Sequence, residues 1–251
     1  EKILIYGDYD VDGTTSVSLV YKFLKQFYSN VDFYIPDRYN EGYGISIQGI
    51  DYAATNDFKL VIALDCGIKA VEKVKYATSV GVDFVICDHH TPDATLPPAV
   101  AVLDPKRDDC NYPYEHLSGC GVGFKLMQAF TIVNNIDFAQ LVPLMELLAL
   151  SIASDIVPIT GENRILAFYG LKQINSNPSI GLKSILDVCG LTDKEISISD
   201  IVFKIGPRIN ASGRMKLASE AVQLLVSSNP VFAKEKSDTI NEYNNDRKDL
   251  D

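Results

Sequence analysis

The sequence predicts an α/β protein, in which a five-stranded parallel sheet with helices on both faces is followed by a helical second half. Two observations predict this class. Short apolar runs alternate with segments of helical periodicity up to Leu103, an order typical of strands joined by crossover helices. The runs are apolar at consecutive positions, as in parallel strands that are buried on both faces. Beyond Ser118 only helical periodicity remains.

The expected strands are five short runs, which span residues 3–6, 31–35, 60–64, 83–87 and 100–103. Apolar spacing predicts connecting helices over residues 14–27, 47–55 and 69–80. In the second half it predicts helices over residues 124–133, 139–154, 164–175, 181–189, 200–204, 218–227 and 231–251. The helix expected over 139–154 is strongly apolar, so we expect it to lie in the core.

Acidic residues follow four of the five expected strands. The first strand is followed by Asp8, Asp10 and Asp12, the third by Asp65, the fourth by Asp88-His89-His90 and the fifth by Asp104. Because ligands bind at the carboxyl ends of the strands in such sheets, these residues predict a binding site at one edge. Alternate residues of an extended chain point the same way, so the three aspartates after the first strand could converge. The alternative for that turn is a polar loop with an aspartate helix cap. We interpret Asp104, which precedes a proline, as a turn residue.

The candidate ligands offer oxygen and nitrogen atoms but no thiolate, and they are Asp10, Asp12, Asp65, His89 and Asp155. Such a set suits Mn²⁺ or Mg²⁺. The number of ligands suits two ions, with Asp65 as the best candidate for a bridging carboxylate. Two ions roughly 3.5–4 Å apart can clamp a phosphate, activate a water and stabilise the departing oxygen. The sequence therefore predicts two-metal phosphate chemistry.

Composition limits the classes of partner and the compartment. The formal net charge of −10 is a poor match to a general nucleic-acid binder, which carries excess Lys and Arg, so a polyanion would need a focused site. The five cysteines lack C-x-x-C spacing, which argues against a zinc site or a disulfide framework and favours a reducing cytosol. The longest apolar stretch contains Glu146 and is too short to span a bilayer. We therefore expect a cytoplasmic protein without a membrane partner.

Four stretches resemble, in order, the motifs of the DHH phosphoesterase superfamily. They are Asp8-Tyr9-Asp10-Val11-Asp12-Gly13, Asp65-Cys66-Gly67, Asp88-His89-His90 and Ser154-Asp155-Ile156-Val157-Pro158. Three further stretches are similar to the RecJ branch of that superfamily, the single-strand-specific 5′→3′ DNA exonucleases. They are RYNEGYG at 38–44, GCGVGFK at 119–125 and PRINASGRM at 207–215. The similarity runs through essentially the whole chain, and seven stretches in order are more specific than the DHH tripeptide alone.

The resemblance implies a role at the metals for each matched acid and histidine. One ion would be held by Asp10 and Asp65, with Asp8 in support, and the second by Asp12, Asp65, His89 and Asp155. His90 would touch the scissile phosphate, and Asp88 would orient the histidines from behind, as metal-bound imidazoles usually require.

The resemblance also implies a set of substrate contacts. Arg38 would bind a phosphate oxygen near the metals, since arginine is a planar bidentate phosphate donor. The path of the strand or a pocket for the 5′-terminal phosphate would be lined by Arg208, Asn210 and Arg214. Gly121 and Gly123 could let backbone N–H groups approach a phosphate. The alternatives are a tight turn at these glycines and a surface ion pair at Arg208.

The implied activity is that of a two-metal-dependent 5′→3′ exonuclease, which hydrolyses phosphodiester bonds of single-stranded DNA in DNA repair and recombination. RecJ proteins carry a second DHH-associated domain after a long helix. We therefore expect residues 1–230 to form the DHH catalytic domain and residues 231–251 to begin that helix. The implied partners of a monomeric protein are single-stranded DNA and a single-strand-binding protein or helicase. The alternatives are a phosphodiesterase for short oligonucleotides or cyclic dinucleotides, and a catalytically inactive scaffold.

Overall fold

The protein contains one sheet of five parallel strands, described by a computed structural model that covers residues 1–250. The strands are β1 (Lys2–Gly7), β2 (Val31–Tyr34), β3 (Phe58–Leu64), β4 (Asp83–Cys87) and β5 (Ala101–Leu103). They lie in the order β2-β1-β3-β4-β5, and every neighbouring pair is parallel. All carboxyl ends therefore meet at one edge, and the predicted sheet is confirmed.

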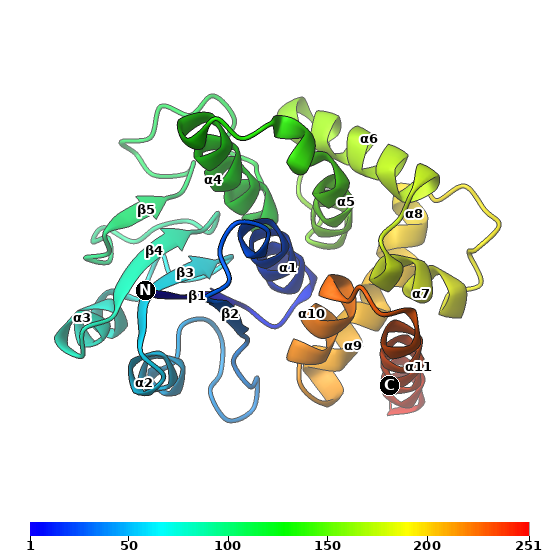
Figure 1. Cartoon of the computed structure of the whole chain (residues 1–251), viewed down its shortest axis with the longest axis horizontal. Coiled ribbons are helices and arrows are strands. Elements are labelled where there is room, and N and C mark those ends of the chain that lie inside the picture. Colours follow the sequence, from blue (N-terminus) through cyan, green and yellow to red (C-terminus); the bar gives the residue numbers. More distant parts are fainter. Residues whose placement is uncertain (251) are drawn as a thin grey trace.

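Helices cover both faces of this sheet (Figure 1). One face packs against α1 (Val11–Lys25) and α4 (Gly119–Asn134), and the other against α2 (Ile47–Thr55) and α3 (Val71–Ser79). Successive residues of β1 alternate between the two cores, because Ile5 belongs to the first and Leu4 and Tyr6 to the second. Burial on both faces explains why the strands are apolar at consecutive positions.

The second half is helical, as predicted. Its elements are η1 (Phe138–Gln140), η2 (Val142–Leu144), α5 (Met145–Ser154), α6 (Gly161–Ser176), α7 (Ile180–Val188), α8 (Ile198–Asp200), η3 (Ile201–Ile205), α9 (Gly206–Met215), α10 (Ser219–Val226) and α11 (Pro230–Leu250). Every residue of α5 from Met145 to Ala153 is buried, and the helix packs against α1, α4 and α6. The core position of this helix fixes where its last turn, and Asp155 after it, meets the sheet.

Three elements of the second half differ most from the predictions. The helix expected over 139–154 is divided into two 3₁₀ turns and α5, because Pro143 has no backbone N–H to donate within a helix. α4 begins at Gly119 rather than at residue 124, with Ser118 as its N-cap. Residues 206–215, for which we predicted no element, form α9, which continues α8 and the π-helical turn η3.

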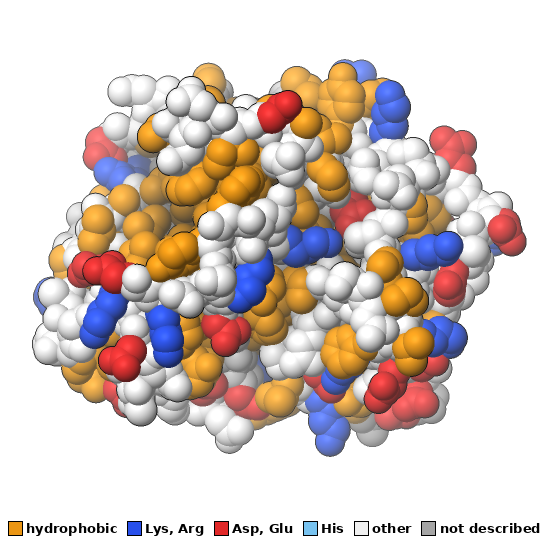
Figure 2. Space-filling view, in the orientation of Figure 1, with side chains coloured by type: hydrophobic (Ala, Val, Ile, Leu, Met, Phe, Trp, Pro, Cys, Tyr) orange, Lys and Arg blue, Asp and Glu red, His pale blue; other side chains and the backbone are white. Residues whose placement is uncertain are grey.

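The surface carries mixed charge. Figure 2 shows acidic and basic side chains interspersed over one face, while apolar side chains gather near α4 and β5. Of the helices within residues 1–250, none is both long and apolar enough to cross a bilayer. A polyanion would therefore be attracted to the face shown in Figure 2 by a local cluster of basic residues, since the face as a whole has mixed charge.

Candidate metal centre

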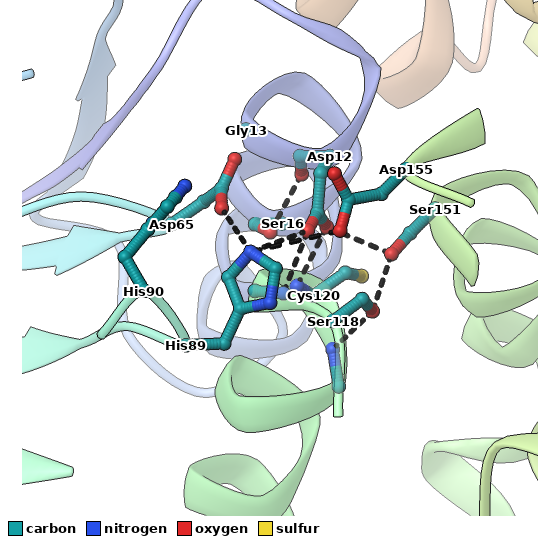
Figure 3. A network of polar contacts seen from close by, with 12 residues as sticks. Asp12, Gly13, Ser16, Asp65, His89, His90, Ser118, Cys120, Ser151 and Asp155 are labelled. Carbon is teal, nitrogen blue, oxygen red and sulfur yellow. Dashed lines mark hydrogen bonds and ion pairs between the residues drawn. The ribbon is translucent and has the colours of Figure 1, made fainter. Parts of the chain in front are cut away.

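Three carboxylates from different elements surround one imidazole nitrogen at the carboxyl edge of the sheet. Nε2 of His89 lies 3.1 Å from Oδ1 of Asp65, and 3.6 Å from Oδ2 of both Asp12 and Asp155. Figure 3 shows these four side chains pointing toward one another. Asp12 lies in the first turn of α1, Asp65 follows β3, His89 follows β4 and Asp155 caps α5. The strand order reverses between β1 and β3, which is where such sheets bind ligands.

The separations suit one hard cation at the centre of this group. Ligands about 2.1 Å from an ion and at right angles to each other lie about 3 Å apart, close to the distances around His89. Oδ1 of Asp65 and both ring nitrogens of His89 are buried and have no hydrogen-bond partner within residues 1–250. Buried polar atoms without partners call for an ion or another ligand. The residues therefore fit Mn²⁺ or Mg²⁺.

The N-terminus of α4 holds the carboxylate of Asp12. The backbone N–H groups of Gly119 and Cys120 donate to its two oxygens at 2.6 and 2.8 Å, and the hydroxyl of Ser151 donates to it at 2.7 Å. Because a helix N-terminus stabilises an anion, this contact both orients the carboxylate and stabilises its charge. A glycine at position 119 also lets this helix end pack against Asp65, since a Cβ there would lie 2.5 Å from Cβ of Asp65.

One ligand of the centre and one residue next to a ligand have left-handed backbone conformations. Asp65 has a φ of 60°, and Ile156, which follows Asp155, has a φ of 57°. Residues other than glycine avoid this region, and β-branched residues avoid it most strongly. Backbone strain of this kind concentrates at functional sites, where the surrounding structure enforces it. The fold therefore places two of the three carboxylates at an energetic cost.

Burial and mutual repulsion raise the pKa of Asp65 and of Asp155. Burial is the larger cause at Asp65, whose pKa lies well above the usual range, and the charges of Asp12 and Asp10 add to it. Burial and then the charge of Asp12 raise the pKa of Asp155 to about 7. Burial lowers the pKa of His89, which favours the neutral imidazole that a metal needs. A divalent cation would offset the repulsion.

Asp8 and Asp10 lie beside this group. Oδ1 of Asp10 accepts a hydrogen bond from the N–H of Gly13 and caps α1, so the helix-cap alternative describes the local structure. The chain turns helical at Val11, so Asp12 does not continue an extended segment, and the expected alternation of the three aspartates is wrong. Burial and then the charge of Asp10 raise the pKa of Asp8 to about 7. The assignment of Asp8 and Asp10 to a second ion stays a prediction.

Asp88 holds the second histidine of the motif. Its Oδ1 lies 2.7 Å from Nδ1 of His90, and its Oδ2 accepts from the N–H of Ile68 at 2.9 Å. Burial favours a higher pKa for Asp88, but these contacts outweigh it and lower the pKa. The same contact raises the pKa of His90. We expected Asp88 to orient the rings of both histidines. It contacts the ring of His90, whereas the ring of His89 faces the three carboxylates.

Arg38 and Arg214 lie near the turn that carries the aspartates. The guanidinium of Arg38 stacks 5.0 Å from the ring centre of Tyr9, and the charges of both arginines act on the hydroxyl of Tyr9. The hydroxyl of Tyr39 donates to the carbonyl of Arg214 at 2.5 Å, which joins the two segments. These positions agree with the expected phosphate contacts, which stay a prediction.

Arg208 is tied to α11. Its Nε donates to Oδ1 of Asn241 and one terminal N–H donates to the carbonyl of Lys204, both at 2.8 Å. The surface ion pair considered as an alternative is therefore wrong, because both partners are uncharged. Asn210 lies half-buried on α9. Contacts of Arg208 and Asn210 with a DNA strand stay predictions.

Gly121 and Gly123 do not open onto a phosphate site. Both are buried in α4. The N–H of Gly121 donates to Oγ of Ser118, and a Cβ at Gly123 would lie 3.1 Å from Leu64. These glycines let α4 pack closely, and the expected phosphate contact is wrong. The anion at this helix N-terminus is the carboxylate of Asp12.

Asp104 holds a turn, as predicted: its Oδ1 accepts a hydrogen bond from the N–H of Lys106 at 2.8 Å, and its carbonyl accepts one from the N–H of Arg107. Asp104 is 3% exposed, and its Oδ2 is buried without a hydrogen-bond partner in the described part of the chain. Burial raises its pKa to about 6. The carbonyl of Leu103 accepts from the N–H of Asp88, so Asp104 follows the end of β5 beside the end of β4. Asp104 therefore has the turn role that was predicted and, in addition, one buried carboxylate oxygen without a partner at the carboxyl edge of the sheet.

Comparison with known proteins assigns the family. The DHH family, N-terminal domain, matches residues 2–152. The chain belongs to the DHH family. This DHH chain is 39% identical over 250 residues to the single-stranded-DNA-specific exonuclease RecJ of Bacillus subtilis, and 34% identical over 261 residues to that of Escherichia coli. Both matches cover all of this chain, but 31% and 45% of the respective relatives, so the chain spans less than half of their length.

A solved structure shares the DHH architecture over the whole chain. A crystal structure of exonuclease RecJ bound to manganese superposes with a TM-score of 0.89 at 29% identity. The match covers 99% of this chain and 62% of that one. The helical second half therefore belongs to the shared fold as well as the sheet.

Proposed function

We propose that the protein hydrolyses phosphodiester bonds of single-stranded DNA with two Mn²⁺ or Mg²⁺ ions, and that it acts 5′→3′ in DNA repair and recombination. The observation that carries the proposal is the convergence of Asp12, Asp65 and Asp155 on Nε2 of His89. The names of the relatives support the substrate, and the manganese bound to a related structure supports the ion.

The residues divide between the ions as follows. One ion would be held by Asp12, Asp65, His89 and Asp155, and the other by Asp10 and Asp65, with Asp8 in support. When bound, such ions polarise the phosphate, lower the pKa of a water and stabilise the departing oxygen. The chain contributes rigidity, because α4 and Ser151 fix Asp12, and the enforced backbone of Asp65 fixes the shared carboxylate.

The substrate side is built around His90 and Arg38. His90 would donate a hydrogen bond to the scissile phosphate, and Asp88 holds its Nδ1 edge. Arg38 would hold a phosphate oxygen, with Arg208, Asn210 and Arg214 along the strand or at its 5′-terminal phosphate. Two of the arginines lie next to Tyr9 in the metal-binding turn, which supports contact with a phosphate close to the ions.

The proposal extends to the complete protein. Residues 1–230 would form the DHH catalytic domain, and α11 would lead toward a second DHH-associated domain. The protein would act as a cytoplasmic monomer together with a single-strand-binding protein or a helicase. The mixed charge in Figure 2 supports recognition of DNA by a local site rather than by a broad basic surface.

The test compares Asp65→Ala and Arg38→Ala variants of the complete protein on a 5′-labelled single-stranded oligonucleotide with Mn²⁺. Asp65→Ala should abolish hydrolysis while the circular dichroism spectrum stays unchanged. Arg38→Ala should raise KM and leave the calorimetric affinity for Mn²⁺ unchanged. An Asp193→Ala variant, changed at an exposed position between α7 and α8, is the control.

Three results would refute parts of the proposal. Full activity of Asp65→Ala would exclude the two-metal mechanism. Faster hydrolysis of dinucleotides or cyclic dinucleotides than of long single strands would exclude single-stranded DNA as the preferred substrate. A wild-type protein with no affinity for Mn²⁺ or Mg²⁺ would instead be an inactive scaffold.

A further inference from the structure

Tyr43 contacts His90, and the proposed mechanism has so far given it no role. Its hydroxyl oxygen lies 3.3 Å from Nε2 of His90. The two rings pack edge to face, with their centres 6.1 Å apart. The opposite ring nitrogen, Nδ1, lies 2.7 Å from Oδ1 of Asp88. The imidazole of His90 is therefore held at one edge by a carboxylate and at the other by a phenol.

His90 needs such support more than its neighbour does. His89 is buried, so packing restricts its ring. The side chain of His90 is 45% exposed, and exposed side chains change rotamer within nanoseconds unless they are bonded in place. A phenol hydroxyl both donates and accepts hydrogen bonds, so it can accept from the Nε2–H of His90 while it donates to the carbonyl of Asp65, 3.5 Å away.

The loop that carries Tyr43 is built to fix its position. Gly42 and Gly44 on either side have φ values of 81° and 75°, a left-handed conformation that glycine adopts without strain. The buried hydroxyl of Tyr6 donates to the carbonyl of Gly44 at 3.0 Å, which anchors the loop to β1. The ring of Tyr43 also packs edge-on against Tyr9, with ring centres 6.3 Å apart. The phenol is thus supported from both the backbone and the ring, although it is 54% exposed.

We propose that Tyr43 is a positioning residue whose hydroxyl holds the Nε2 edge of His90 until the substrate binds, so that the imidazole is already oriented when the Nε2–H exchanges the phenol oxygen for a phosphate oxygen. This inference rests on the proposed function, in which His90 contacts the scissile phosphate. Groups that orient the residues of a metal site are worth about 10–100-fold in activity. We expect the lower end of that range, because Asp88 still holds Nδ1 when the phenol is absent.

The kinetic test uses Tyr43→Phe, which removes one oxygen and keeps the ring. Tyr76→Phe is the matched control, since it removes a hydroxyl that donates to Asp51 at 2.6 Å on the side of the sheet covered by α2 and α3. In the complete protein with Mn²⁺ and single-stranded DNA, Tyr43→Phe should lower kcat about tenfold. KM and the affinity for Mn²⁺ should stay unchanged, and Tyr76→Phe should behave as the wild type.

A spectroscopic test needs no activity. The chain has three histidines, so ¹⁵N-histidine labelling with single His→Gln variants assigns each ring in long-range ¹H–¹⁵N spectra of the metal-free protein. Tyr43→Phe should move the Nε2 resonance of His90, and Tyr76→Phe should not. An unmoved resonance would overturn the contact, and a moved resonance with unchanged kcat would overturn its part in the reaction.

Two further outcomes separate this inference from the proposed function. Loss of Mn²⁺ affinity in Tyr43→Phe would overturn the assignment of Tyr43 to His90, because the phenol would then act through the metals. Absence of hydrolysis by the wild-type protein would refute the proposed function, while the Nε2 resonance would still decide whether Tyr43 holds His90.

Discussion

Replacing Asp155 with asparagine should stabilise the metal-free protein and weaken its affinity for Mn²⁺. The carboxylate of Asp155 lies 3.6 Å from Nε2 of His89. Burial first, and then the charges of Asp12 and Asp10, raise its pKa from 3.8 to about 7. Asparagine keeps the shape of the side chain and removes its charge, so the repulsion disappears and no cavity forms.

The pKa gives the size of the effect. Each pKa unit corresponds to about 1.4 kcal/mol, so a rise from 3.8 to about 7 costs the folded protein about 4 kcal/mol at pH 8. The side chain is 27% exposed, and water screens part of the repulsion, so we expect asparagine to recover about 2 kcal/mol. In a chain of this length, that free energy raises Tm by roughly 4–8 °C.

Calorimetric scans in the presence of a chelator measure the difference. The raised pKa belongs to the folded state, so the cost is absent below about pH 4, grows up to about pH 7 and is complete at pH 8. The advantage of the variant should therefore shrink to below about 1 kcal/mol at pH 5. With saturating Mn²⁺ the wild type should have the higher Tm and Asp155→Asn the lower. The control Asp193→Asn should have the Tm of the wild type under all of these conditions. The reasoning would be refuted if Asp155→Asn were no more stable than the wild type at pH 8, or if its advantage in stability were as large at pH 5 as at pH 8.

Mn²⁺ should raise the Tm of the wild-type protein more at pH 8 than at pH 6, because Asp8 and Asp155, each with a pKa of about 7, bind the ion after losing a proton; equal gains in thermal scans at the two pH values would contradict this. Gly119→Ala should weaken Mn²⁺ binding about tenfold, since its Cβ would lie 2.5 Å from Cβ of Asp65, and calorimetric titration with an unchanged affinity would count against it. Ile156→Gly should add about 1 kcal/mol to the free energy of unfolding in urea. Relief of a strained left-handed residue stabilises the fold by about 1–3 kcal/mol, and the larger chain entropy of an unfolded glycine cancels about 0.5–1 kcal/mol of that gain. The side chain of Ile156 is 79% exposed, so little burial is lost; Ile156→Ala keeps the Cβ and should show no such gain.

The residues of the site that follow strands could be predicted, because a buried apolar run gives way to an acid or a histidine where each strand ends. A run of consecutive apolar residues ends where the strand leaves the core, so Asp65 and His89 stand out at the carboxyl edge of the sheet. Asp155 is recognisable for a related reason, since it ends an apolar helix. The order of the strands then brings these ends together without further information.

The partner of the helix N-terminus could not be predicted from local sequence. A glycine-rich segment that opens a helix is typical of a phosphate site. Here the anion is the carboxylate of Asp12, which lies 107 positions from Gly119 along the chain. Nothing within the segment distinguishes an external phosphate from an internal carboxylate, because the donor groups are the same backbone N–H groups.

α9 was missed for a different reason. Its sequence contains Gly, Pro, Asn and Ser, which have low helix propensity. Close packing explains their presence. A Cβ at Gly206 would lie 2.7 Å from Oγ of Ser154, and one at Gly213 would lie 2.4 Å from the carbonyl of Tyr9. The small residues that weaken the local helix signal are those that let α9 reach the metal-binding turn.

The metal centre concentrates features that oppose folding. Buried carboxylates repel one another, and Asp65 and Ile156 hold strained backbone conformations. These residues lie at the ends of the central strands and of α5, whose residues Met145–Ala153 are buried, and the apolar cores of these elements can offset such costs. Because a bound cation turns the repulsion into attraction, the stability of the protein should follow metal binding closely. Substitutions that neutralise Asp65 or Asp155 should therefore stabilise the metal-free fold and weaken its affinity for the metal, whereas neutralising Asp12, whose carboxylate accepts three hydrogen bonds, should not stabilise it.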